Sequence, residues 1–149
     1  MKRDIKLFGG YLIMLLAISI LAGCVTQSPK ELLFQNIENG QNSELTEKVF
    51  IVINTEPEWE GFCRLLNKNS CEMDLDFEKN TIIVASMGEQ NTGGHLIKIK
   101  KIVEQGDTIV VYVEEKYPSE GEMVTQVLTY PYDIVSISKT SKSIVFRNN

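Results

Sequence analysis

Residues 96–115 read LIKIKKIVEQGDTIVVYVEE, and this stretch decides the fold class. Two runs of apolar and β-branched residues, 96–103 and 108–115, flank the turn-forming segment 104–107, which predicts a β-hairpin. Working outward, similar runs predict further strands at 32–37, 48–53, 72–78, 81–87, 124–128, 133–138 and 143–146. The run 81–87 is apolar on both faces and should be a central strand. We therefore expect a mainly β fold, an antiparallel β-sandwich or partly open barrel of about eight strands.

One helix is expected, at about residues 56–67. Thr55, Pro57 and Glu58 supply an N-cap, a first-turn proline and the acidic partner of a capping box. Apolar side chains then follow at spacings of three and four, namely Trp59, Phe62, Cys63, Leu65 and Leu66. This amphipathic stripe should pack on a sheet, which places Trp59 in the core rather than in a binding site.

The N-terminal segment has the features of a lipoprotein signal peptide. Lys2, Arg3 and Lys6 precede an apolar run, residues 11–21, that leads into Gly23-Cys24. The ending Leu-Ala-Gly-Cys resembles the bacterial lipobox, which implies cleavage before Cys24 and a diacylglyceryl group on its thiol. A transmembrane helix is the alternative, but it needs about 20 apolar residues.

These features predict the organisation of the whole chain. Residues 1–23 are expected to be the signal peptide, 24–31 a lipidated tether, and 32–149 a single domain. The lipid on Cys24 would hold this domain at the extracytoplasmic face of a bacterial cell membrane.

The composition argues against two classes of function. Without residues 1–23 the chain carries 12 basic and 19 acidic residues, a formal net charge of −7. Phosphate backbones repel such a surface, so nucleic acid is not an expected partner. The sequence contains no nucleophile elbow, no phosphate-binding glycine loop and no His/Cys cluster at metal spacing. We therefore expect no catalytic residue, metal or cofactor.

Cys63 and Cys71 leave two interpretations open. Outside the cytoplasm an even pair of cysteines favours a disulfide between them. Alternatively, either thiol acts as a nucleophile with His95, the single histidine of the chain, as its base. The second interpretation is the basis of an alternative function, a thiol-dependent enzyme.

The segment 88–95 is the candidate binding loop. Its glycines permit positive φ angles and the close approach of another backbone. Two interpretations are open, a hairpin with a bulge or a recognition loop on a rigid sheet. In the second, the partner-binding residues would be Asn91, Thr92, Gly93, Gly94 and His95. Further along, Pro131 predicts a kink between two strands, with Tyr130 and Tyr132 covering the core.

Over about residues 47–146 the chain is similar to the PrcB C-terminal domain family. The residues that carry this resemblance are Trp59, Asp76-Phe77, the strand 81–85, Gly88-Glu89, Thr92-Gly93-Gly94, the strand 96–99, the segment 123–129 and Tyr130-Pro131-Tyr132. The family pattern has Tyr after the two glycines, where this chain has His95. The resemblance implies a noncatalytic lipoprotein that associates with a surface protease and supports its stability or maturation.

The loop 91–94 also resembles, more weakly, the Asn-Pro-Thr-Thr-Gly loop of chagasin-like cysteine-protease inhibitors, which insert loops into an active-site cleft. This likeness implies a second alternative function, a loop-inserting protease inhibitor. The function expected first is an anchored, noncatalytic domain that binds an extracytoplasmic protein and stabilises or assists it. A protease is the partner that the family resemblance implies.

Overall fold

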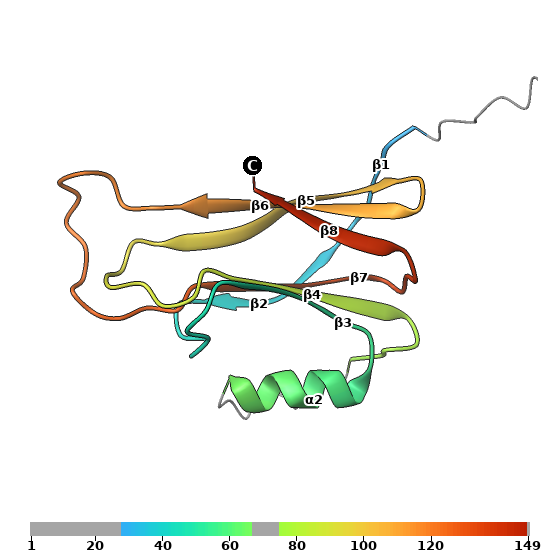
Figure 1. Ribbon diagram of the computed structural model, residues 1–149, viewed down its shortest axis with the longest axis horizontal. Coiled ribbons are helices and arrows are strands. Elements are labelled where there is room, and N and C mark those ends of the chain that lie inside the picture. The colour runs from blue at the N-terminus through green and yellow to red at the C-terminus, as the bar shows by residue number, and fades with distance from the viewer. Residues whose placement is uncertain (1–27, 67–74, 149) are drawn as a thin grey trace, which may run out of the picture.

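The computed structural model describes residues 28–66 and 75–148, and within them two four-stranded sheets face each other (Figure 1). Sheet 1 has the order β1 (Lys30–Glu31), β5 (Leu96–Gln105), β6 (Thr108–Lys116) and β8 (Ser143–Asn148). Sheet 2 has the order β2 (Gln35–Gly40), β7 (Tyr132–Ser138), β4 (Asn80–Ser86) and β3 (Val49–Ile53). The sheets do not close into a barrel, so the fold is the expected β-sandwich.

The strand pairs are antiparallel with one exception. β8 pairs in parallel with β6, starting from Thr108 opposite Ser143. Between these two strands the chain crosses to sheet 2 for β7 and then returns to sheet 1. It arrives beside the turn where β6 begins, since the Ser143 N–H donates to the Asp107 carbonyl oxygen at 3.3 Å. Because β7 carries the chain back along sheet 2 to the end where β6 begins, β8 starts beside the start of β6 and runs in the same direction.

The helix α2 (Glu56–Leu65) covers the outer face of sheet 2 (Figure 1). Its capping box forms as predicted: the Glu58 N–H donates to Thr55 Oγ1, and the Thr55 N–H donates to Glu58 Oε2 at 3.1 Å. Trp59, with 4% of its surface exposed, packs with Ile82 and Ile134 in the layer between α2 and sheet 2. The expected helix and the core position of Trp59 are confirmed.

The central strand β4 contributes to two apolar layers. Ile83 and Ala85 face sheet 1 and belong to the core between the sheets. Ile82 and Val84 face α2 and belong to the second layer. This double burial explains why the four consecutive residues 82–85 are all apolar, and it confirms the predicted central strand.

A buried carboxylate connects the two sheets. Asp133 of β7 is 1% exposed, and its Oδ2 accepts the Ile99 N–H of β5 at 2.8 Å. Its Oδ1 accepts a hydrogen bond from Asn36 Nδ2 of β2 at 2.7 Å. Burial raises the pKa of the Asp133 carboxyl above its ordinary value, although both hydrogen bonds act in the opposite direction.

The structure corrects several predicted strands. Residues 75–79 do not form a strand, since a turn there is fixed by Asp76 Oδ1, which accepts the Glu78 N–H at 3.0 Å. The remainder of the predicted strand 72–78 lies outside the described residues. Residues 124–128 belong to a long irregular connection. The first long strand runs over 35–40 instead of 32–37, and the last two residues of the expected tether form β1.

Candidate functional site

Two connections between the sheets form one end of the molecule, on the left in Figure 1. The loop 88–95 leads from β4 of sheet 2 to β5 of sheet 1. Residues 117–131, here called the strap, lead from β6 back to β7. Because the loop crosses between sheets, the interpretation of 88–95 as a hairpin with a bulge is wrong.

The strap holds the loop by hydrogen bonds along its length. Gln90 and Thr129 exchange two backbone hydrogen bonds, at 2.8 and 2.9 Å. Thr129 Oγ1 donates to the Thr92 carbonyl oxygen at 2.8 Å. Further along, the Gly93 N–H donates to the Thr125 carbonyl oxygen at 2.9 Å. The backbone groups of the loop that could pair with a partner strand are therefore already bonded in part to the strap of the same chain.

The two glycines of the loop serve this packing. Gly93 is buried, and a Cβ at this position would lie 2.3 Å from Thr125 Oγ1. Gly94 has a φ of +86°, and a Cβ there would lie 2.9 Å from Val124 Cγ1. The close approach predicted for these glycines thus occurs with the strap of the same chain.

His95 fixes the far end of the loop. Its Nε2 lies 3.3 Å from Thr92 Oγ1, and its ring meets Tyr117 edge-on with 5.6 Å between the ring centroids. The His95 carbonyl oxygen accepts a hydrogen bond from Gln41 Nε2 at 2.9 Å. Among the predicted partner-binding residues, Asn91 and Gly94 are exposed, whereas Thr92 and His95 are half-buried.

A third segment, residues 41–46, is hydrogen-bonded to both the strap and the loop. The Tyr130 N–H donates to the Gln41 carbonyl oxygen at 2.6 Å, and Ser43 Oγ donates to the Tyr130 carbonyl oxygen at 3.0 Å. The Glu89 N–H donates to the Thr46 carbonyl oxygen at 3.0 Å. Pro131 lies where the irregular strap leads into β7, so it does not join two strands as predicted. Tyr132 is buried as expected, whereas Tyr130 is half-buried and its hydroxyl donates to Glu89 Oε2 at 2.9 Å.

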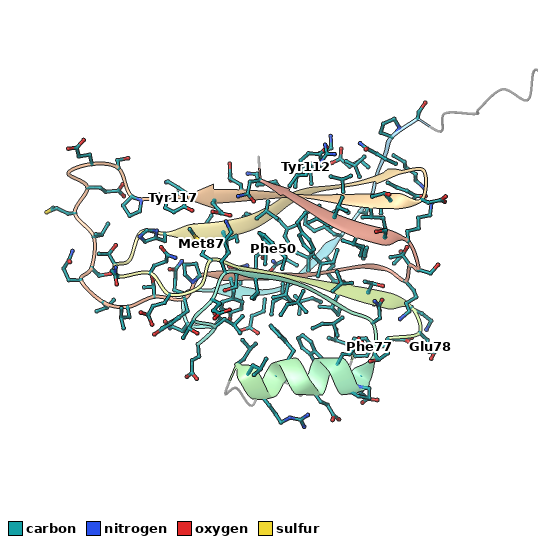
Figure 2. The ribbon with its side chains drawn as sticks, in the orientation of Figure 1. Phe50, Phe77, Glu78, Met87, Tyr112 and Tyr117 are labelled. Atoms are coloured by element: carbon teal, nitrogen blue, oxygen red, sulfur yellow. The ribbon has the colours of Figure 1, made fainter. Side chains whose placement is uncertain are left out.

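Exposed apolar side chains gather at this end among exposed polar ones such as Glu120, Glu122 and Gln126, and this feature was not predicted. In the described part of the chain eight large apolar side chains are exposed, and five of them lie here. We call these five residues the apolar end: Leu96, Tyr117, Met123, Val127 and Leu128. Met123 is 99% exposed and Tyr117 is 56% exposed. Figure 2 shows Tyr117 at this end of the molecule. The sequence predicts a strand over 124–128, and nothing in it indicates that the apolar residues of this stretch are exposed together.

Cys63 and His95 are not brought together as a dyad. Cys63 is 1% exposed in the layer between α2 and sheet 2, whereas His95 stands in the loop beside Tyr117. Cys63 takes part in a disulfide, and both other cysteines, Cys24 and Cys71, lie outside the described residues. The bridge from Cys63 to Cys71 and the lipid on Cys24 therefore remain predictions. Residues 28–66 and 75–148 contain no acidic, His or Cys cluster that could hold a metal.

The packing of Gly93 gives a first testable prediction. We expect Gly93→Ala to lower the free energy of unfolding by about 1–3 kcal/mol, because the new methyl group collides with Thr125 Oγ1. Thr125→Ala removes that oxygen from an exposed residue, so the double variant should regain most of the stability. Urea unfolding of the four proteins measures this coupling. Additive effects would show that the loop does not pack under the strap at this point.

Comparison with known proteins supports the family expected from the sequence. A family model described as PrcB C-terminal matches residues 81–138, which extend from β4 to β7 and include both the loop and the strap. No curated protein and no solved structure matches the chain. Among the described helical residues, none form a helix long and apolar enough to span a membrane.

Proposed function

We propose that this chain, whose residues 81–138 match the PrcB C-terminal family, is a noncatalytic lipoprotein domain that binds a protein partner through its apolar end. The lipid on Cys24 would anchor it at the extracytoplasmic face of the membrane. The family match suggests that the partner belongs to a protease complex. Binding would stabilise or assist that partner.

The apolar end is the observation that carries this proposal. Exposed apolar side chains are normally scattered singly, whereas five of the eight large ones among the described residues lie at this one end, and such a concentration favours an interaction surface. Aromatic residues and methionine, here Tyr117 and Met123, are enriched at such surfaces. The backbone beneath them is fixed by the hydrogen bonds between strap and loop, so little ordering would be needed on binding.

The position of the tether agrees with this role. Lys30 and Glu31 pair with Glu104 and Val103, beside the β5–β6 turn. The strap follows Lys116, at the other end of β6, and a strand of this length spans about 30 Å. Tether and apolar end thus lie at opposite ends of sheet 1 (Figure 1), which leaves the apolar end open to a partner.

The two alternative functions have less support. A loop-inserting inhibitor needs a projecting loop, but Gly93 is buried and its N–H is bonded to the strap. A thiol-dependent enzyme needs an accessible thiol beside a base, but Cys63 lies buried under sheet 2.

The proposal is tested by capture from a detergent extract of the source cell's envelope. Residues 26–149 serve as bait, since they contain the whole described fold. We expect Met123→Ser/Val127→Ser/Leu128→Ser to weaken retention of the partner more than tenfold, because burying each of these side chains against a partner is worth about 1 kcal/mol or more. The matched control is Leu33→Ser/Leu65→Ser/Val145→Ser, which changes three exposed apolar residues outside the apolar end.

Met123→Ser/Val127→Ser/Leu128→Ser is here called the strap variant. The proposal is supported if mass spectrometry identifies one protein that both the wild type and the control retain but the strap variant loses. Melting temperatures of the three baits verify that all are folded. Equal retention by all three baits would show that the apolar end does not bind the partner.

A further inference from the structure

The outer face of sheet 1 is basic, although the chain as a whole has a net charge of −5. In β5 the isoleucines Ile97, Ile99 and Ile102 point into the core between the sheets. The alternating side chains point outward, and they include three lysines. Together with residues of β6 and β8 they make up what we call the basic face: Lys98, Lys100, Lys101, Lys116 and Arg147, all exposed.

The register places these side chains on neighbouring strands. Lys101 lies opposite Tyr112, and Tyr112 lies opposite Arg147. Figure 2 shows Tyr112 on the side of sheet 1 that faces away from sheet 2. Lys116 lies opposite Leu96, two residues from Lys98 along β5. The five charges therefore share one surface.

Acidic residues neutralise part of this surface. Glu114 pairs with Lys100 at 3.3 Å, and Glu31 pairs with Lys101 at 3.4 Å. Within the described ranges no ion pair involves Lys98, Lys116 or Arg147. Five basic and two acidic side chains leave the face with a net positive charge.

The opposite side of the molecule is acidic. Five described acidic residues on and beside α2, namely Glu56, Glu58, Glu60, Asp76 and Glu78, outnumber three basic ones, Arg64, Lys79 and Lys139. Figure 1 shows α2 beyond sheet 2, on the side away from sheet 1. The molecule thus has a charge polarity perpendicular to its sheets.

The tether would bring the basic face close to the bilayer. β1 is the edge strand of sheet 1, and Lys30 follows Cys24 by six residues. Six extended residues reach about 20 Å at most. An anionic surface attracts basic side chains only within about a Debye length, so a short tether of this kind makes the attraction effective.

We propose that the basic face lies against anionic lipid headgroups. This inference rests on the proposed anchor for its location, but the attraction belongs to the folded domain and needs no lipid on Cys24. One acylated site gives weaker retention than the same site combined with a basic surface. With sheet 1 against the bilayer, α2 and its glutamates face away, and the apolar end points along the membrane.

The test is vesicle sedimentation of residues 26–149, which lack the lipid-bearing cysteine. Vesicles of phosphatidylglycerol mixed with phosphatidylcholine are compared with pure phosphatidylcholine, at about 0.05 M and about 0.5 M NaCl. We expect the protein to sediment with the anionic vesicles at the lower salt concentration, but not with them at the higher one and not with pure phosphatidylcholine at either. Lys98→Gln/Lys116→Gln/Arg147→Gln should weaken this binding by up to about 100-fold, since each basic residue near an anionic surface contributes about fivefold.

The matched control is Arg64→Gln/Lys79→Gln/Lys139→Gln, which removes the same charge around α2. It should bind as the wild type does, and circular dichroism verifies that both variants are folded. Equal binding by the two variants, or no binding by the wild type, would overturn the proposal. Stronger binding to a soluble polyanion than to vesicles would also overturn it. The strap variant should bind vesicles normally, which separates this result from the test of the proposed function.

Discussion

Gly88→Ala is expected to lower the free energy of unfolding by about 3–5 kcal/mol, which combines backbone strain with overpacking. Gly88 is buried with a φ of +76°, a conformation that disfavours any Cβ. A Cβ there would also lie 2.7 Å from the Lys48 nitrogen and 2.8 Å from the Thr46 oxygen. Both are backbone atoms, and the Thr46 oxygen already accepts the Glu89 N–H, so no side-chain rotation relieves the collision.

Gly106→Ala is the matched control for this prediction. Gly106 also has a positive φ, +61°, but its added Cβ would meet nothing within 4 Å. We expect a loss of about 1 kcal/mol from backbone strain alone. Chemical denaturation of both variants measures the difference. Similar losses for the two glycines would contradict the close packing of residues 46–48 on the loop.

The second large effect is expected at Asp133. Asp133→Ala leaves the buried Ile99 N–H and the Asn36 amide without their acceptor, which should cost about 2–4 kcal/mol. Asn36→Ala removes the hydrogen bond to Asp133 and the one that Asn36 Oδ1 accepts from Asn39 Nδ2, both at an exposed residue, and should cost about 1 kcal/mol. Denaturant unfolding at neutral pH compares the two. An equal cost for both substitutions would show that Asp133 does not hold the sheets together.

The raised pKa of Asp133 should also make the free energy of unfolding depend on pH, with the contribution of this residue falling as pH rises. Burial raises the pKa of its carboxyl in the folded protein, so the folded state retains a proton that the unfolded chain has already released. The contribution of Asp133 to stability is therefore greatest below its ordinary pKa and falls as pH rises through the raised value. The stability of wild type minus that of Asp133→Asn, which does not titrate, should decrease from acidic to neutral pH. A difference that increases with pH would contradict the raised pKa.

Sequence reasoning succeeded where the determining interactions are local. The capping box at Thr55 and Glu58 fixes the start of α2 within four residues. The hairpin of β5 and β6 follows from a turn between two runs of β-branched residues. For β4, burial on both faces follows directly from an uninterrupted apolar run.

Prediction failed where distant segments decide the outcome. Residues 124–128 were predicted to form a strand, but they pair with no strand of the described ranges and lie over the loop instead, with Val124 beside Gly94 and Thr125 beside Gly93. Gly93 was assigned to partner binding because its packing partner, Thr125, is 32 residues away. Asp76 lies in an acidic and apolar alternation, yet its side chain caps a turn.

The net charge similarly concealed the distribution of charge. A value of −7 for residues 24–149 indicated an acidic surface, whereas the register gathers basic side chains on the outer face of sheet 1. The alternation of Ile97 and Ile99 with lysines indicates a basic side to one strand. Only the pairing with β6 and β8 shows that neighbouring strands extend it into a surface.

Site-specific photo-crosslinking in the source cell tests the central claim, the binding of a partner at the apolar end, most directly. A photoreactive residue replaces Met123, which is 99% exposed, or Leu65, which is 62% exposed on α2. We predict that the probe at 123 crosslinks to one protein, whereas the probe at 65 gives no such product. The same product from both positions, or none from 123, would contradict the account.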